Sequence, residues 1–236
     1  MKAIILAAGT GSRMKGLTSS KPKCLLELHN NSIIEHQILL LNKFGIFNID
    51  VITGFESDKI KKILKDKVNY YYYPDFEKTN NLYTLNYHSN LLNDDLLILF
   101  SDLLIHPDIL GSLISNKSDF SFMVDISKCD ESTMRVNIVN NLIKDIGSHV
   151  SVDGGDGNFI GISKFSRKAS KLLKKRMNYI VSKGIYNDDY YTKAIADMAL
   201  EGQEINFVDV KNRPWLEVDT EEEYNIAKKE SFYVID

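Results

Sequence analysis

The N-terminal stretch constrains the fold of this chain more than any other part of the sequence. An apolar run, Ala3–Leu6, leads directly into a glycine-rich turn that contains Gly9 and Gly11. A strand without polar residues is typical of a parallel sheet that is covered on both faces. The glycines let backbone N–H groups approach a phosphate chain, and two cations that follow, Arg13 and Lys23, can neutralise it. The stretch therefore predicts a strand–loop unit that binds a nucleoside triphosphate.

Two familiar phosphate-binding motifs do not fit this loop. In the dinucleotide fingerprint a third glycine is required where Met14 stands, and no acidic residue ends the next strand, which closes on residues 52–54. Residues 11–18 have the glycine and threonine spacing of a Walker A motif. Leu17 occupies the place of the lysine that must reach the β- and γ-phosphates, so we reject this motif too.

A third motif, L-A-A-G-x-G-x-R-M followed by K-P-K, matches in full. It resembles the motif of the pyrophosphorylase-type nucleotidyltransferases, which make NDP-linked metabolites from an NTP and a phosphorylated acceptor. The matching positions are Leu6, Ala7, Ala8, Gly9, Gly11, Arg13, Met14, Lys21, Pro22 and Lys23.

Composition limits the class of protein. A chain of 236 residues can form one domain with a substantial core, and its net charge of −3 argues against a nucleic-acid partner. No apolar run approaches the roughly 20 residues of a membrane span. Met1 leads directly into a strand without a signal-peptide pattern, and Cys24 and Cys129 lack metal or redox spacing. We therefore expect a cytoplasmic protein with reduced thiols and no membrane or nucleic-acid partner.

Strands and helices alternate through the first half. This alternation predicts βαβ units and a largely parallel sheet, as in Rossmann-like three-layer α/β/α folds. The expected strands are 2–6, 49–53, 68–72 and 96–100, and the expected helices are 32–45, 55–65 and 79–93.

The second half is richer in strands. We expect a single domain over residues 1–236, in which residues 120–165 form a small β-rich lid on the acceptor side. The expected strands are 120–125, 134–139, 142–146, 159–165, 204–210 and 214–218, and the expected helices are 166–183, 188–201 and one that Thr220 and Glu223 cap.

Two aspartates follow strands that should end at the same edge of the sheet. Ser101 and Asp102 come directly after strand 96–100, and Asp219 follows a strand at 214–218. Ligands of open parallel sheets bind at the carboxyl ends of the strands. Carboxylates are suitable ligands for Mg²⁺, which also binds substrate phosphates. We expect Asp102 and Asp219 to hold Mg²⁺, although each could instead only cap a turn.

Two further groups of residues could each have either a binding role or a purely structural role. Asn80 and Asn81 could pair with a nucleobase edge, or they could belong only to the start of a helix that Thr79 caps. Aromatic rings and carboxylates together can hold an ammonium group, although taken in isolation such residues are more often core aromatics and solvated acids. The second group, which we expect to bind the acceptor, comprises Asp189, Tyr190, Trp215 and Glu217.

With these segments in hand, the chain resembles the choline-phosphate cytidylyltransferase-like subgroup of nucleotidyltransferases over nearly its whole length. Besides the N-terminal motif, the resemblance rests on residues 80–85, 101–102, 134–136, 157–166, 190–191 and 215–220. It implies a Mg²⁺-dependent transfer of CMP from CTP to phosphocholine, 2-aminoethylphosphonate or a similar small phosphate or phosphonate, with release of pyrophosphate.

The resemblance also implies residue roles. Arg13 would stabilise the β- and γ-phosphates, and Lys23 would contact the α-phosphate or the acceptor. The nucleotide would lie against the loop and the ends of neighbouring elements, at Leu6, Ala7, Ala8, Gly9, Thr10, Gly11, Asn80, Asn81 and Ser101.

One position departs from the pattern. Relatives often carry a lysine after the Ile-Gly pair near the acceptor phosphate, where this chain has Ser148. Two explanations stay open: Lys164 supplies the missing charge, or the acceptor binds in a different position. Two rival functions stay open: a sugar-1-phosphate nucleotidyltransferase that uses UTP or another NTP, and a non-catalytic nucleotide-binding regulator. A homodimer stays open as well.

Overall fold

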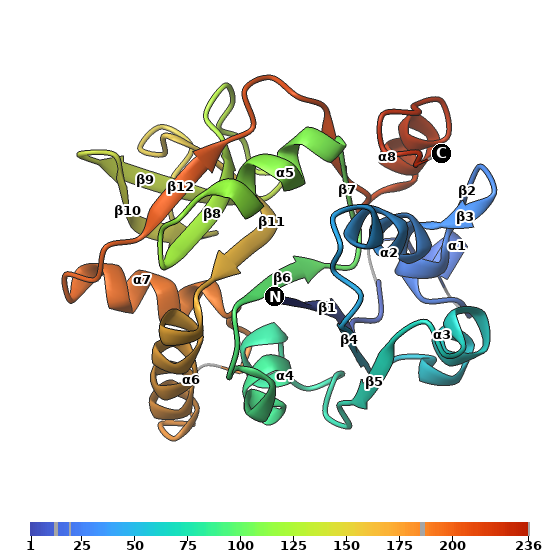
Figure 1. Cartoon of the computed structure of the whole chain (residues 1–236), viewed down its shortest axis with the longest axis horizontal. Coiled ribbons are helices and arrows are strands. Elements are labelled where there is room, and N and C mark those ends of the chain that lie inside the picture. Colours follow the sequence, from blue (N-terminus) through green and yellow to red (C-terminus); the bar gives the residue numbers. More distant parts are fainter. Residues whose placement is uncertain (12–13, 19, 185–186, 236) are drawn as a thin grey trace.

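A computed structural model describes residues 1–11, 14–18, 20–184 and 187–235. The first half of the chain forms the parallel part of a central sheet, in the order β6-β1-β4-β5 (Figure 1). Ala3 of β1 is paired with Ile49 of β4 on one side and with Leu97 of β6 on the other. The strands are β1 (Lys2–Ala7), β4 (Ile49–Thr53), β5 (Asn69–Tyr72) and β6 (Leu96–Phe100).

The second half extends the same sheet with mostly antiparallel strands. β11 (Gly157–Phe165) pairs with β9 along its first residues and with β6 along its last, and its pairing with β8 shifts in register between Phe159 and Ser163. The other strands are β8 (Phe120–Asp125), β9 (Met134–Val139), β10 (Leu142–Gly147) and β12 (Asn206–Asp209), which is parallel to β8. The region expected as a lid is thus continuous with the main sheet.

Helices cover both faces of the sheet. Successive residues of β1 belong to different hydrophobic clusters, since Ile4 packs with the α4, α6 and α7 side and Ile5 with the α2, α3 and α5 side. The fold is therefore the three-layer α/β/α arrangement that the sequence predicts. These helices are α2 (Ile33–Lys43), α3 (Ser57–Leu64), α4 (Asn81–Tyr87), α5 (Pro107–Ser115), α6 (Arg167–Val181) and α7 (Thr192–Leu200).

A third cluster joins the two ends of the chain beside the sheet. Here β13 (Trp215–Glu217) pairs antiparallel with β7 (Leu103–Ile105), and the C-terminal helix α8 lies near the N-terminal hairpin (Figure 1). The remaining elements are α1 (Lys15–Thr18), η2 (Lys23–Leu25), β2 (Glu27–Leu28), β3 (Asn31–Ser32), η3 (Ser89–Leu91) and α8 (Glu221–Ala227). None of the described helices has the length and apolarity needed to cross a membrane.

Candidate active site

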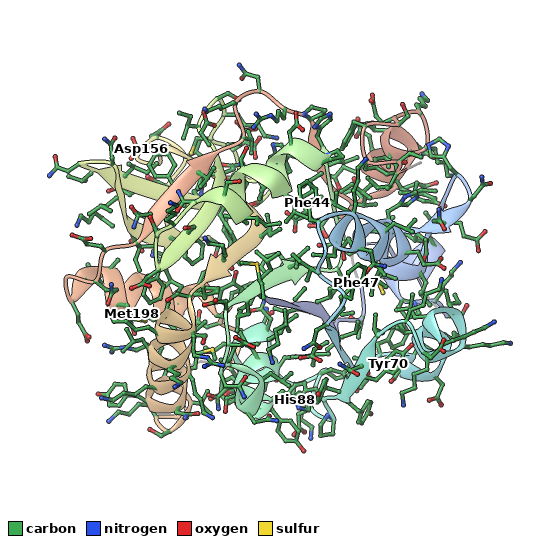
Figure 2. All side chains as sticks on the ribbon, viewed as in Figure 1. Phe44, Phe47, Tyr70, His88, Asp156 and Met198 are labelled. Atoms are coloured by element: carbon green, nitrogen blue, oxygen red, sulfur yellow. The ribbon has the colours of Figure 1, made fainter. Side chains whose placement is uncertain are left out.

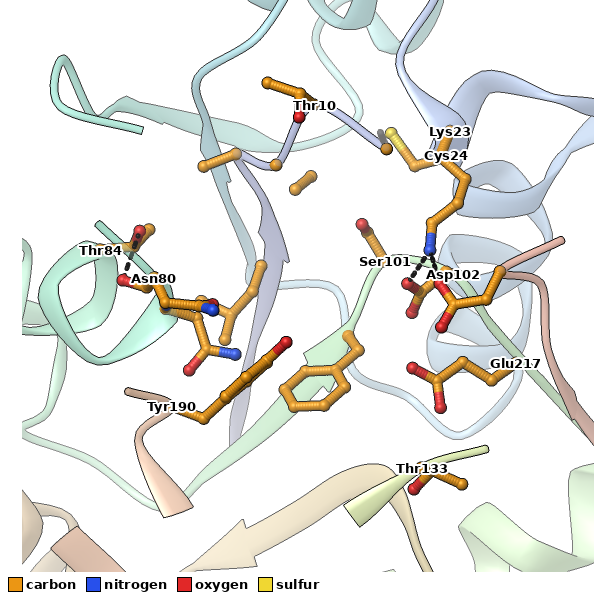
Figure 3. A pocket seen from close by; sticks show the side chains of 18 of the residues that line it. Thr10, Lys23, Cys24, Asn80, Thr84, Ser101, Asp102, Thr133, Tyr190 and Glu217 are labelled. Carbon is orange, nitrogen blue, oxygen red and sulfur yellow. Dashed lines mark hydrogen bonds and ion pairs between the residues drawn. The ribbon is translucent and has the colours of Figure 1, made fainter. Parts of the chain in front are cut away.

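A cavity of about 610 Å³ opens at the carboxyl ends of β1 and β6 (Figure 3). In open α/β sheets this is the edge at which ligands bind. The cavity is lined by every described residue that the sequence analysis expected to bind the nucleotide. These are Leu6, Ala7, Ala8, Gly9, Thr10, Gly11, Asn80, Asn81 and Ser101. Arg13, expected to bind the β- and γ-phosphates, lies outside the described residues.

The glycine loop that follows β1 is held in place by its neighbours. Phe55 donates a backbone hydrogen bond to the carbonyl of Ala8 at 3.1 Å. This contact requires a glycine at Gly54, where a Cβ atom would lie 2.7 Å from the same carbonyl oxygen. Gly11 has a φ of +65°, which glycine adopts readily, and its carbonyl accepts a hydrogen bond from Thr18 Oγ1 at 2.9 Å. The loop is therefore anchored on both sides.

Lys23 lies between two of the predicted carboxylates. Its Nζ is 2.5 Å from Asp102 Oδ2 and also contacts Asp219 Oδ1 (Figure 3). Burial disfavours the ammonium, but the two carboxylates outweigh burial and hold the pKa of Lys23 above its ordinary value. The side chain is thus a fixed cation on the floor of the cavity.

Glu217 completes a group of three carboxylates. Oxygen atoms of Asp102, Glu217 and Asp219 all lie within 4.8 Å of one another. The pairing of β13 with β7 places Glu217 opposite Leu103, the residue after Asp102. Asp102 Oδ1 is buried and has no hydrogen-bond partner among the described residues. Three convergent carboxylates, one with an unsatisfied buried oxygen, fit a hard divalent cation such as Mg²⁺.

The start of α8 holds Asp219 in place. The side chain of Glu223 accepts backbone hydrogen bonds from Asp219 at 2.7 Å and Thr220 at 2.8 Å. Thr220 caps the helix in return, which is the capping box that the sequence predicts. Val218 donates to the carbonyl of Asp102 at 2.9 Å, so the two loops that carry the aspartates are tied directly together.

Asn80 and Asn81 have structural roles and also line the cavity. The Asn80 side chain accepts a hydrogen bond from the backbone N–H of Asn81 at 2.8 Å, as the N-cap of α4. Asn81 Oδ1 accepts from the backbone of Tyr191 at 2.8 Å. Both amides are therefore oriented by contacts that leave them in the cavity lining, and Figure 3 shows Asn80 on the same side as Tyr190.

The expected acceptor residues divide into two groups. Tyr190 and Glu217 line the cavity, whereas Lys164, Asp189 and Trp215 do not. The amino group of Lys164 is bonded to the carbonyl of Asn116, so the structure does not bring it into the cavity.

Trp215 and Asp189 lie outside the cavity lining. Trp215 Nε1 donates to Asp125 Oδ2 at 2.8 Å, and the ammonium of Lys128 lies 4.3 Å from the centre of its ring. Burial raises the pKa of Asp189 above its ordinary value, with Lys193 opposing that shift. Neither side chain lines the cavity, so their acceptor roles gain no support from its geometry and stay predictions.

The sequence analysis expected an acceptor-side lid and singled out Ser148, but it gave no role to the other residues on this side of the cavity. This side comes from the loop before β9, the start of β9 and the residue after β10. For Met134 and Arg135 the available signal was the Met-Arg-Val segment at 134–136, which contributed to the resemblance without a role. We call this surface the β9 wall and define it by Glu131, Ser132, Thr133, Met134, Arg135 and Ser148.

Comparisons with known proteins agree with this geometry. A CTP:phosphoglutamine cytidylyltransferase from Campylobacter jejuni is 31% identical over 185 residues, which is 70% of this chain and 73% of that one. A choline-phosphate cytidylyltransferase from Streptococcus pneumoniae is 38% identical over 87 residues, which is 36% of this chain and 38% of that one.

Solved structures share the fold. The structure of the CTP:phosphocholine cytidylyltransferase of Streptococcus pneumoniae superposes with a TM-score of 0.80 and covers 97% of both chains, at 20% identity. The inositol-1-phosphate CTP transferase of T. maritima also gives a TM-score of 0.80, at 18% identity over 98% of this chain and 95% of that one. Residues 2–132 match the family model described as nucleotidyl transferase, and the chain belongs to that family.

Proposed function

We propose that this protein transfers CMP from CTP to a small phosphorylated or phosphonate acceptor and releases pyrophosphate. The observation that carries the proposal is the position of Lys23 among three carboxylates, directly beside a glycine loop in one cavity. The two relatives and both solved structures reported above use CTP by name. They differ in acceptor, so the nucleotide is the better supported half of the proposal.

The reaction needs little acid–base chemistry. An oxygen of the acceptor phosphate or phosphonate attacks the α-phosphorus of CTP, a new P–O bond forms, and the bond from that phosphorus to the β-phosphate oxygen breaks. The attacking oxygen already carries negative charge near neutral pH, so no general base is required. The protein mainly has to position two anions and neutralise them.

Lys23 is suited to that task because it remains protonated throughout the neutral range. Its ammonium group is already fixed by Asp102 and Asp219, so little reorganisation is needed when charge develops nearby. The glycine loop contributes backbone N–H groups, and Arg13 is proposed to complete the neutralisation of the β- and γ-phosphates.

Mg²⁺ is proposed as the cofactor. Asp102, Asp219 and Glu217 would hold it, since their oxygen atoms converge and one oxygen of Asp102 is buried without a partner. The cation would supply charge stabilisation between the α-phosphate and the acceptor.

Tyr190 and Glu217 favour an acceptor with a cationic group. Both line the cavity, and an aromatic ring with a carboxylate can bind an ammonium. Phosphocholine and 2-aminoethylphosphonate combine such a group with the required anionic oxygen. No observation favours a sugar phosphate over these compounds.

A pyrophosphate-release screen tests the proposal. CTP, UTP, ATP and GTP would each be combined with phosphocholine, 2-aminoethylphosphonate, phosphorylated amino acids and sugar 1-phosphates, with and without Mg²⁺. We expect turnover with CTP and an amino-containing acceptor. Turnover with a sugar phosphate and another NTP would support the sugar nucleotidyltransferase, and nucleotide binding without turnover in any combination would support the regulator.

A further inference from the structure

The β9 wall lies across the cavity from the glycine loop. Figure 3 shows Thr133 and Thr10 at opposite sides, with Glu217 on the side of Thr133. If the glycine loop holds the triphosphate, the β9 wall faces the acceptor. This assignment rests on the proposed function.

One side chain holds this wall together. The guanidinium of Arg135 donates hydrogen bonds to four backbone carbonyls from two separate segments. On the segment before β9 these are the carbonyls of Asp130 and Thr133, each at 3.3 Å, and after β10 they are the carbonyls of Ser148 and Val150. Among side chains, only the planar guanidinium of arginine has five N–H donors and can bond so many acceptors at once.

The environment of Arg135 is unusual for an arginine. The residue is 8% exposed, and no carboxylate of the described residues forms an ion pair with it. A buried arginine normally has an anionic partner, because the charge is costly to desolvate. Here backbone carbonyls solvate the guanidinium, and its positive charge stays unneutralised in the wall of the cavity.

The positive charge of Arg135 lies beside Ser148, the position at which relatives often carry a lysine. The guanidinium bonds the carbonyl of Ser148 itself, so a cation lies next to that residue although its own side chain is a hydroxyl. Register explains the contact, since Arg135 on β9 is paired with Gly147 at the end of β10. Arg135, rather than Lys164, therefore brings a positive charge to Ser148.

We propose that Arg135 is a positioning residue that sets the affinity for the acceptor but not for CTP. It fixes residues 130–133 and 148–150 as one surface, and it gives that surface a positive charge that suits an anionic acceptor. Loss of the guanidinium would release both segments, while the glycine loop, across the cavity, would keep its shape.

Two variants separate this role from simple stability. Arg135→Met removes all donors and the charge at similar length, and Arg135→Lys keeps the charge but has donors on a single nitrogen atom. Asn137→Ala is the matched control, because Asn137 lies two residues further along β9, outside the cavity lining, and its side chain donates to the carbonyl of Gly154 at 3.1 Å.

Kinetics with 2-aminoethylphosphonate and phosphocholine form one arm of the experiment. For Arg135→Met we expect the acceptor KM to rise on the order of 10–100-fold while the CTP KM stays within about twofold of wild type. Arg135→Lys should restore part of the loss, and Asn137→Ala should match wild type. An equal change in both KM values would overturn the proposal.

Amide hydrogen exchange forms the second arm and needs no acceptor. In Arg135→Met, or in Arg135→Lys if the methionine variant does not fold, residues 130–133 and 148–150 should exchange faster, with CTP affinity unchanged. If wild type turns over no acceptor, the proposed function fails while this arm still tests the Arg135 contacts. Unchanged exchange in both segments would overturn the role of Arg135 even where turnover is found.

Discussion

At the scale of single residues, the site depends on one cation among three carboxylates. Lys23 forms ion pairs with Asp102 and Asp219. A carboxylate oxygen of Glu217 lies within 4.8 Å of an oxygen of each aspartate. The side chains of Lys23 and the two aspartates are each at most 15% exposed, so screening by water is weak. The ammonium therefore has both a structural and a chemical role, and these roles can be separated by experiment.

Substitution of Lys23 by methionine should reveal both roles. Two carboxylates would lose their cation, and we expect the free energy of unfolding in EDTA to fall by about 3 kcal/mol, as for a buried ion pair that loses one partner. Added Mg²⁺ should recover most of this loss, whereas turnover should stay low because the fixed ammonium is gone. Thermal unfolding with and without Mg²⁺, together with pyrophosphate release, measures the two effects.

The control for this variant is Lys21→Met in the same K-P-K segment. Lys21 forms an exposed ion pair with Glu27 at 3.0 Å, and pairs of that kind contribute little. It should therefore unfold like wild type. A Lys23→Met protein that keeps near-full turnover, or one that melts without responding to Mg²⁺, would contradict the dual role.

Asp102→Asn tests the proposed metal site without changing the size of the side chain. The amide keeps the shape but removes a charge from the group of three carboxylates, so turnover should drop on the order of 10²–10³-fold at saturating Mg²⁺. Direct titration of Mn²⁺, followed by its paramagnetic signal, should show weaker binding. Asp108→Asn, at the exposed start of α5, is the control, and full turnover by Asp102→Asn would exclude a metal role.

At the scale of elements, the sequence predicts those helices and strands that have a clear local pattern of apolar residues. Strand β6 is apolar throughout and strand β1 is apolar after Lys2, and both lie in the sheet within one residue of their expected bounds. Strand β7 was missed because three residues, Leu103–Ile105, are too few to establish a period. It is a strand only because β13, more than 100 residues later, pairs with it. Helix α5 was missed although Pro107 occupies its first turn, a recognisable start signal.

The same distinction holds for the site. Lys23, Asp102 and Asp219 could be predicted because each follows a motif or a strand end, and parallel strands end at one edge. Arg135 could not, because its role arises from the register of β9 and β10. Lys164 and Trp215 lie outside the cavity lining: the amino group of Lys164 bonds the carbonyl of Asn116, and Trp215 Nε1 donates to Asp125, contacts that depend on tertiary packing and carry no local sequence signal.

The junction of β4 with the glycine loop supplies a prediction at this scale. In Gly54→Ala the new Cβ would lie 2.7 Å both from the Ala8 carbonyl and from Phe76, so the loop must shift. We expect a loss of about 1–3 kcal/mol in the free energy of unfolding, as for overpacking elsewhere. The CTP KM should rise more than the acceptor KM, which is the reverse of the pattern expected for Arg135→Met.

Gly16→Ala is the control for this prediction, since an added Cβ there would meet no atom within 4 Å. Chemical unfolding and the two KM values give the comparison. If Gly54→Ala raised both KM values equally, the separation of the cavity into a nucleotide side and an acceptor side would be in doubt.

At the scale of the whole molecule, the cavity lies where two kinds of sheet meet. The parallel half supplies the glycine loop, and the antiparallel half supplies the β9 wall. The C-terminal strand β13 and helix α8 then return to the first half and bring Glu217 and Asp219 to Asp102. The complete site therefore depends on packing between both ends of the chain.

His36 lies in that packing and should make the stability of the whole fold depend on pH. It is 2% exposed, its Nε2 is 3.0 Å from the carbonyl of Leu28, and its ring packs edge-on against Tyr233 near the C-terminus. Its Nδ1 is buried and has no partner among the described residues, so a second proton there would be unsatisfied. Burial lowers the pKa of His36 and outweighs the hydrogen bond with the Leu28 carbonyl, which raises it; His29 adds a smaller lowering and Glu35 a smaller rise.

The sign of the effect follows from that direction. The unfolded chain has a histidine pKa of about 6.5, so below this pH it binds more protons than the folded protein does. The contribution of His36 is complete above about pH 6.5 and is lost as the pH falls toward the folded pKa. Urea unfolding at about pH 7.5 and about pH 5.5 should show a larger loss for wild type than for His36→Gln, whose amide can still donate to Leu28 but does not titrate. A stability difference between the two proteins that stays the same at both pH values would mean that His36 is not the titrating group.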